Sequence, residues 1–203
     1  MQGECPSAAR ADELRGAVRR TYRLVAAGAE GRFPYPVGRG SALRLGYESE
    51  WLDAAPADVV ARFVGVGNPF AIARPRGGDR VLDVGCGCGL DVFVAGRLAG
   101  RDGSAVGIDI SPEMLDLPRR LLGRGPLGNL EFREADVERL PFEDAEFNLV
   151  ISNGALNLAP DKDRAFRELH RVLRPGGVFA VADLLVTGTV PAEVLQDLDA
   201  WST

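Results

Sequence analysis

The fold is decided by residues 80–89, which read Arg80-Val81-Leu82-Asp83-Val84-Gly85-Cys86-Gly87-Cys88-Gly89. The first five residues form a short apolar run that is typical of a buried β-strand. Three alternating glycines follow, and glycine allows both a sharp backbone turn and the close approach of a ligand. A helix is expected directly after them, from Leu90 to Leu98. The stretch therefore predicts a strand, a ligand-binding turn and a helix.

The rest of the chain continues this alternation of strands and helices. Further strands are expected at residues 105–110, 130–134, 147–152 and 178–186. Pro118 should kink or end one of the intervening helices, and Arg174-Pro175-Gly176-Gly177 is a strong helix stop. Five apolar strands joined by helical crossovers predict an α/β fold, a doubly wound Rossmann-like parallel sheet. Ligands bind such sheets beyond the carboxyl ends of the strands.

Residues 1–76 lack this pattern and are expected to form an N-terminal helical segment ahead of a Rossmann-like domain at residues 77–203. One helix is predicted from residue 1 to about 30, then a Pro/Gly-rich loop at Phe33 to Gly40 and a short helix near Asp53 to Val64. A final helix is expected from Pro191 to Trp201.

Composition excludes several function classes. The 203 residues carry a net charge of −5 with no run of lysine and arginine, which predicts binding to neither nucleic acid nor an anionic membrane. No stretch approaches the roughly 20 apolar residues of a membrane span. Three cysteines make no disulfide framework, so a reducing cytoplasm is the expected location.

Carboxylates follow the second and third expected strands. Asp109 ends the second strand, where a carboxylate can accept both hydroxyls of a ribose. Asp136 leaves the third strand and is placed to accept a hydrogen bond from an adenine amino group. A dinucleotide would fit these features too, but its fingerprint requires glycine where this chain has Leu90, and Asp91 would repel a pyrophosphate. A cofactor without phosphates is favoured.

At this point the chain resembles the class I S-adenosylmethionine-dependent methyltransferases. The resemblance covers about Asp79 to Val186, and its motifs are residues 83–89, Gly107 to Leu115, Asp136, Leu140-Pro141-Phe142 and Arg174-Pro175-Gly176-Gly177. It implies S-adenosylmethionine as cofactor and an enzyme that transfers its methyl group. It also implies that the N-terminal segment is a lid, because a tyrosine-bearing helix, here with Tyr22, covers the methionine end of the cofactor in related enzymes.

The resemblance assigns cofactor-binding residues one by one. Gly85, Gly87 and Gly89, with Asp83 before them, would cradle the amino-acid end. Asp109 would hold the ribose, Ile110 and Met114 would pack on the adenine, and Asp136 and Val137 would read its edge. Asn153 would lie near the methyl group. Structural alternatives stay open: Ile110 and Met114 as core residues, Asn153 as a turn residue, and Cys86 and Cys88 as packing groups. No catalytic residue is assigned, and His170 is not expected to be one.

A narrower resemblance joins the chain to the arsenite methyltransferase branch. It is carried by residues 150–158, Asp161-Lys162, Gly65-Val66-Gly67-Asn68-Pro69 and Trp201. Enzymes of that branch hold As(III) with cysteine thiolates, which are soft donors for a soft metalloid. The matching positions here are Val66 and Gly154, and a third family cysteine would follow Trp201. The resemblance therefore implies a small-molecule acceptor other than arsenite, and no metal site.

The C-terminal end of the sheet is expected to be incomplete. Family members add two more strands after the last helix, whereas this sequence stops at Thr203. Either the sequence is truncated or the protein is a shortened variant, and one sheet edge would be bare unless another element or chain covers it, as in a homo-oligomer. Three functions stay open: an active methyltransferase, a non-catalytic S-adenosylmethionine-binding module or fragment that needs a partner, and, less favoured, a nicotinamide-dependent oxidoreductase.

Overall fold

The computed structural model describes residues 6–28, 31, 33, 35–122, 128–185, 187–188, 197–198 and 201. Its centre is a five-stranded sheet in the order β3-β2-β1-β4-β5, in which every neighbouring pair is parallel. The strands are β1 (Arg80–Val84), β2 (Ser104–Asp109), β3 (Leu130–Glu134), β4 (Phe147–Asn153) and β5 (Leu173–Ala182). The expected Rossmann-like α/β fold is confirmed.

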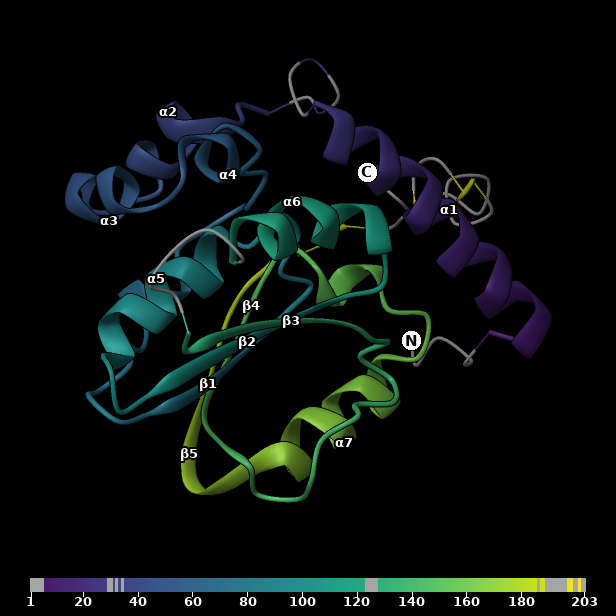
Figure 1. Ribbon diagram of the computed structural model, residues 1–203. Coiled ribbons are helices and arrows are strands. Elements are labelled where there is room, and N and C mark those ends of the chain that lie inside the picture. Colours follow the sequence, from purple (N-terminus) through teal and green to yellow (C-terminus); the bar gives the residue numbers. More distant parts are fainter. Residues whose placement is uncertain are drawn as a thin grey trace.

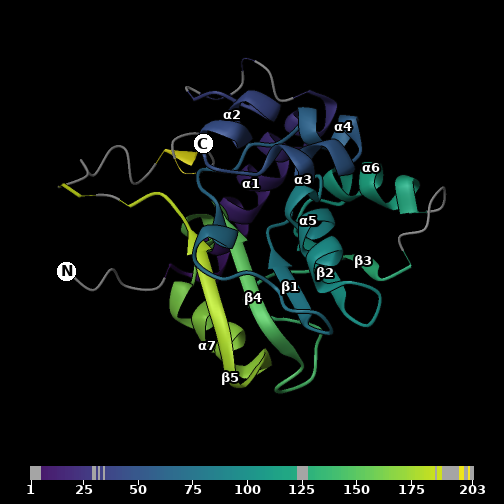
Figure 2. The ribbon, with the colours of Figure 1, turned by 90° about the vertical axis from the view of Figure 1, so that its left-hand side faces the viewer.

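Helices cover both faces of the sheet (Figures 1 and 2). On one face lie α5 (Leu90–Ala99) and α6 (Pro112–Leu122), and on the other lies α7 (Lys162–Val172). Successive strand residues point to opposite faces, so Val81 packs in the core under α5 while Leu82 packs in the core over α7. The continuous apolar run of β1 thus results from burial on both sides.

The N-terminal segment lies beyond the carboxyl ends of the strands (Figure 2). It contains α1 (Ala8–Ala27), α2 (Gly38–Arg44), α3 (Ser49–Ala54), α4 (Ala57–Ala61) and the short 3-10 helix η1 (Pro69–Ala71). Helix α1 packs on α6. The region from α2 to η1 is joined to the core under α5 by an aromatic cluster of Tyr47, Trp51, Phe63 and Phe70.

Two expectations for the N-terminal segment are wrong in detail. The predicted loop at Phe33 to Gly40 already contains the start of α2, which begins at Gly38. The single helix expected near Asp53 to Val64 is two helices, broken before Pro56. Proline forces the residue before it out of the helical region, and Ala55 is accordingly extended, with φ −83° and ψ 152°.

The C-terminal half differs from the sequence-based prediction in two places. Helix α6 does not end early but continues through Pro118 to Leu122, held by its buried apolar face. Strand β5 begins at Leu173, directly after α7, so the Arg174 to Gly177 motif lies inside the strand rather than ahead of it. A shift in the pairing with β4 between Phe147 and Leu149 accommodates it.

Several C-terminal expectations cannot be compared with the structure. Val186 and nearly all of the expected final helix lie outside the described residues. Within the described part of the chain, β5 pairs with β4 and forms the edge of the sheet. None of the described helices is long and apolar enough to cross a membrane.

Two further short elements complete the path of the chain. The 3-10 helix η2 (Leu156–Leu158) follows β4 and leads into α7. Asp161 caps α7, because its side chain accepts a hydrogen bond from the Arg164 amide at 2.9 Å. The loop after β4 therefore turns back across the ends of the strands, where it contributes to the pocket described next.

Candidate functional site

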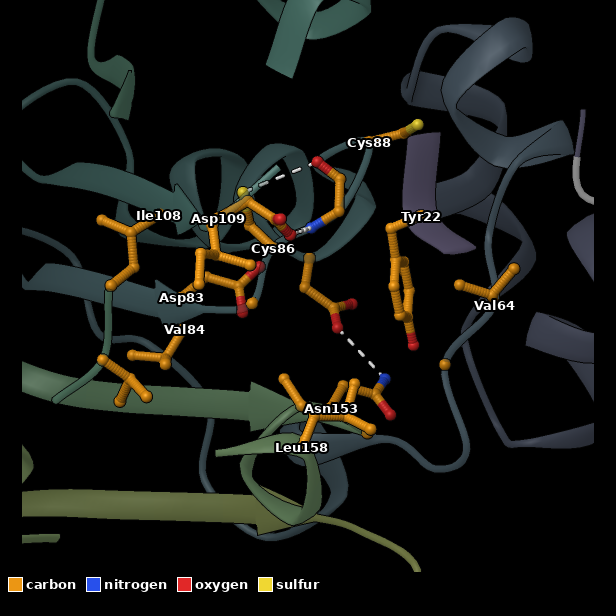
Figure 3. A pocket seen from close by; sticks show the side chains of 18 of the residues that line it. Tyr22, Val64, Asp83, Val84, Cys86, Cys88, Ile108, Asp109, Asn153 and Leu158 are labelled. Atoms are coloured by element: carbon orange, nitrogen blue, oxygen red, sulfur yellow. Dashed lines mark hydrogen bonds between the residues drawn. The ribbon is translucent and has the colours of Figure 1, made fainter. Parts of the chain in front are cut away.

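A pocket lies beyond the carboxyl ends of β1, β2, β3 and β4, where a doubly wound sheet binds its ligand (Figure 3). It encloses about 1040 Å³ of empty space, part of it open to solvent. Nine of the predicted cofactor-binding residues line it: Asp83, Gly85, Gly87, Gly89, Asp109, Ile110, Asp136, Val137 and Asn153. The topology thus brings together residues that lie up to 70 positions apart in the sequence, from Asp83 to Asn153.

Backbone amides of the glycine loop after β1 donate hydrogen bonds to residues of β2. The amides of Gly85 and Cys86 both donate to the Ile108 carbonyl at 2.9 Å, and the Gly87 amide donates to Asp109 Oδ2 at 2.9 Å. Gly87 has φ +54° in the left-handed region, and a Cβ on Gly85 would overlap that of Ala155. The glycines are therefore needed for the turn itself and leave a bare backbone facing the pocket.

Asp109 ends β2 with its carboxylate held by two backbone donors. Oδ2 accepts from Gly87 N at 2.9 Å, and Oδ1 accepts from Ser111 N at 2.8 Å. The residue is 8% exposed, and burial raises the pKa of its carboxyl to about 6 even though these hydrogen bonds lower it. Each oxygen keeps a second lone pair, which suits the carboxylate to a pair of hydroxyl donors.

Asp83 lies at the end of β1 and is 2% exposed. Its Oδ2 is buried and has no hydrogen-bond partner. Burial, together with the nearby charges of Asp91 and Asp109, raises the pKa of Asp83 well above its ordinary value. A buried oxygen without a partner is costly, so the pocket floor favours a ligand that brings a donor or a positive charge.

Asn153 ends β4 and connects three parts of the site. Its amide oxygen accepts from the backbone amides of Val66 at 2.9 Å and Gly67 at 3.1 Å. Its Nδ2 lies 3.2 Å from Asp91 Oδ2, the bond drawn from Asn153 in Figure 3, and 3.1 Å from the Tyr47 hydroxyl. Tyr47 in turn donates to Asp91 Oδ1 at 2.6 Å.

The sequence pattern does not single out Tyr47, which lies in the loop between α2 and α3. Asp91 was considered only as a group that repels a pyrophosphate. The structure shows it as a pocket-lining carboxylate, 5% exposed, whose pKa burial raises to about 6 against the lowering effect of its two hydrogen bonds. A buried carboxylate needs donors, and that requirement was the one available signal for a partner such as Tyr47.

Asp136 is bound by the protein itself. Its Oδ2 accepts from Arg15 Nε of α1 at 2.7 Å, and its Oδ1 accepts from the Glu138 amide at 2.9 Å. Arg15 also forms an ion pair with Glu138, a carboxylate that is 4% exposed and accepts from the Asp161 amide. Asp136, the residue expected at the adenine, thus binds Arg15 and joins the loop after β3 to α1. We call the contacts of Arg15 with Asp136 and Glu138 the latch. Nothing in the sequence pattern identified Arg15.

The other predicted residues have clear positions. Met114 does not line the pocket; it is fully buried against Cys88, Val25 and Phe33. Burial raises the pKa of the Cys86 thiol well above its ordinary value and that of Cys88 to about 12, so neither forms a thiolate near pH 7. His170 is exposed on α7 and away from the pocket.

Three comparisons with known proteins bear on this pocket. A family model described as "Methyltransferase domain" matches residues 75–203, which is more than half of the chain. The chain belongs to this methyltransferase family. An arsenite methyltransferase of Halobacterium salinarum is 41% identical over 157 residues, which are 77% of this chain and 40% of the relative.

Two further comparisons also find methyltransferases. A ubiquinone/menaquinone biosynthesis C-methyltransferase UbiE of Pseudomonas entomophila is 44% identical over 109 residues, 53% of this chain and 43% of the relative. The crystal structure of CrArsM, an arsenic(III) S-adenosylmethionine methyltransferase from Chlamydomonas reinhardtii, is 36% identical with a TM-score of 0.66, over 76% of this chain and 56% of that one. The chain spans about two fifths of the length of the curated relatives it matches.

CrArsM is an S-adenosylmethionine methyltransferase, and S-adenosylmethionine is therefore the group whose fit to this pocket is tested. The pocket fits it on three observations: a bare glycine backbone, a carboxylate with two free lone pairs at Asp109, and an unpaired oxygen on Asp83 in a wall rich in carboxylates. The cofactor carries a sulfonium, an ammonium and ribose hydroxyls, which are the groups that such a wall accepts. Among the described residues, no cluster of histidine, cysteine and carboxylate side chains could hold a metal ion.

Proposed function

We propose that this chain transfers the methyl group of S-adenosylmethionine to a small-molecule acceptor other than arsenite. The observation that carries the proposal is the acidic character of the pocket: Asp83, Asp91 and Asp109 surround a glycine loop. A pyrophosphate would face Asp91 in the first turn of α5, where helix N-termini otherwise bind anions. A nicotinamide dinucleotide is therefore disfavoured, and a cationic cofactor is favoured.

The roles of the cofactor-binding residues belong to this proposal. Gly85, Gly87 and Gly89 would lie along the methionine moiety, and Asp109 would hold the ribose. Ile110, Asp136 and Val137 line the side of the pocket next to β2 and β3, which supports their place at the adenine. Met114 supports the loop from behind, since a Cβ on Gly87 would lie 3.2 Å from its Cε.

The bound cofactor supplies an electrophilic methyl group on a positively charged sulfur. The chain contributes alignment, because a displacement at that carbon depends on the approach of the acceptor in line with the breaking bond. Carboxylates near the pocket favour the charge of the bound cofactor before transfer and lose that attraction when the sulfur becomes neutral. No general base is required of the protein when the acceptor is already a nucleophile.

The acceptor side of the pocket argues against arsenite. Gly154 lines the pocket, and Val66 packs beside it, because a Cβ on Gly154 would lie 3.4 Å from both Val66 methyl carbons. The two positions that match arsenic ligands in the related enzymes are thus neighbours here, and neither offers sulfur. An apolar wall at this place suits a carbon or other small apolar acceptor better than a metalloid ion.

We also propose that residues 1–76 act as a lid on the domain formed by residues 77–203. Three contacts support it: Tyr22 projects from α1 into the pocket (Figure 3), Arg15 binds Asp136, and Arg19 Nε donates to the Ile110 carbonyl at 3.1 Å. Such a cover would exclude water from the reacting groups. Association of two chains through the β5 edge stays a prediction.

Titration of the purified chain with S-adenosylhomocysteine and, separately, with a nicotinamide dinucleotide tests the cofactor. Calorimetry should show stoichiometric binding of the first and no heat from the second. Transfer of a labelled methyl group from S-adenosylmethionine to a panel of small thiols, phenols and quinols, with arsenite included, then tests the activity. Cofactor binding without transfer to any acceptor would favour the non-catalytic binding module.

A further inference from the structure

Asp91 is a buried carboxylate on the pocket wall that has no cation as partner among the described residues. Its two oxygens accept from neutral donors only, the Tyr47 hydroxyl at 2.6 Å and Asn153 Nδ2 at 3.2 Å. The two arginines that line the pocket are engaged elsewhere. Arg15 binds Asp136 and Glu138, and Arg62 donates to backbone carbonyls of α1 and α4.

The charge around Asp91 makes this arrangement costly without a ligand. Asp83 and Asp109 line the same pocket, and Asp83 is close enough for the two carboxyl groups to influence each other's ionisation. A buried charge without a counter-ion is unfavourable, and three carboxylates in one wall add mutual repulsion. A cationic group of a bound ligand would remove both costs.

The position of Asp91 selects which cationic group that would be. The sheet order places β1 between β2, which ends at Asp109, and β4, which ends at Asn153. Asp91 accepts a hydrogen bond from Asn153 and therefore belongs to the β4 side of the pocket. A cofactor with its ribose at Asp109 extends across the glycine loop toward this side with its amino-acid end.

We propose that Asp91 binds the α-ammonium group of the cofactor, and that Tyr47 and Asn153 position the Asp91 carboxylate for this contact. The assignment rests on the proposed function. Asp83 is the less suitable partner, because it is more deeply buried than Asp91. Asp109 has both oxygens bonded to backbone amides on the other side of β1.

The contact is measurable as a coupling between one protein group and one ligand group. Two ligands are titrated calorimetrically: S-adenosylhomocysteine and its deaminated analogue, in which hydrogen replaces the ammonium. Wild-type protein should bind S-adenosylhomocysteine about 10-fold or more tightly than the analogue, the range of one charged hydrogen bond. Asp91→Asn keeps the shape and one acceptor oxygen but removes the charge, so that preference should fall to about twofold or less.

Two variants separate this contact from a general effect on the pocket. Asp109→Asn should weaken both ligands by the same factor, because ribose is common to them. Tyr47→Phe removes one hydroxyl from the aromatic cluster and should lower the affinity for S-adenosylhomocysteine while that for the analogue stays within about twofold. A merely structural role of Tyr47 would weaken both ligands alike.

The outcomes distinguish this assignment from the function on which it rests. Wild-type protein that binds both ligands equally, or an Asp91→Asn variant that keeps the full preference, overturns the ammonium contact and leaves cofactor binding intact. Wild-type protein that binds neither ligand overturns the proposed function and the contact together. The wild-type comparison needs no variant, so equal binding overturns the contact even where Asp91→Asn fails to fold, and Tyr47→Phe then tests the assignment to Asp91.

Discussion

Asp109→Asn should make the free protein more stable at neutral pH and the cofactor complex weaker. Burial raises the pKa of Asp109 from 3.8 to about 6, a change of roughly two units or about 3 kcal/mol. An acid whose pKa rises on folding binds more protons in the folded state, so stability falls as pH rises from about 4 to about 6. Above that window the ionised carboxylate imposes its full cost.

The asparagine variant removes this cost but also weakens one hydrogen bond. It keeps an acceptor oxygen for one of the two amides, Gly87 or Ser111, and loses the other bond at about 0.5–1.5 kcal/mol. The expected net gain in free energy of unfolding is therefore about 1.5–2.5 kcal/mol at pH 8. At pH 4 the ionisation cost is nearly absent, so the gain is about zero or slightly negative. Loss of a charged bond to ribose should weaken S-adenosylhomocysteine by about 1.5–3 kcal/mol, which is about 10- to 150-fold in Kd.

Urea unfolding followed by circular dichroism at pH 8 and pH 4, with calorimetry at pH 8, measures both effects. Asp116→Asn is the matched control, because this aspartate lies exposed on α6 and its neutral form should change neither quantity by more than about 0.5 kcal/mol. A variant that is less stable at pH 8 than at pH 4 relative to wild type would refute the electrostatic reasoning. An unchanged Kd in a folded variant would refute the ribose contact.

Three further predictions concern the walls of the pocket. Arg15→Met should lower the free energy of unfolding by about 1–3 kcal/mol in urea, because it leaves buried Glu138 without a cation; an unaffected midpoint would contradict the latch. Arsenite should neither bind tightly nor become methylated, and cysteines introduced at Val66 and Gly154 should raise As(III) affinity in a fluorescence titration, although Gly154 has φ +73° and a side chain there costs about 1–2 kcal/mol. Bound S-adenosylhomocysteine should slow trypsin cleavage between Arg10 and Arg44 on gels, whereas protection confined to residues after Gly78 would mean that this segment is not a lid.

The local sequence pattern was sufficient to predict most strands of the sheet, but not the start of β5 or of helix α2. The expected strands at residues 80–84 and 130–134 have the same bounds in the structure, where β1 is buried from Val81 onward and β3 alternates buried with partly exposed residues. The Arg174 to Gly177 motif misled because its helix-stopping residues also tolerate a bulged strand, and pairing with β4 decides between the two. The start of α2 among glycines was equally hidden, since tertiary packing against α4 stabilises it.

Those residues of the site that directly follow a strand could be predicted from the sequence. Asp109 and the glycine loop follow from strand position alone, and the structure brings them into contact. Tyr47 and Arg15 were not predictable in this way, because their partners lie 44 and 121 residues away and no periodicity encodes such a distance. For Met114 the sequence left a core position open beside the adenine contact, and the structure buries the side chain beneath the glycine loop, where the volume has to be filled.

The Asn153 side chain fastens the segment from Gly65 to Gly67 to the end of β4 through three hydrogen bonds, two accepted and one donated. Gly65 and Gly154 line the pocket on the β4 side, whereas Asp109 ends β2 on the other side of β1. Substitutions at Val66 or Gly154 should therefore reshape the acceptor wall at little expense to cofactor affinity. Variants with an altered choice of acceptor are therefore best sought by substitution at these two positions. Asn153 should be kept unchanged, because its hydrogen bonds hold the backbone of residues 65–67 in place.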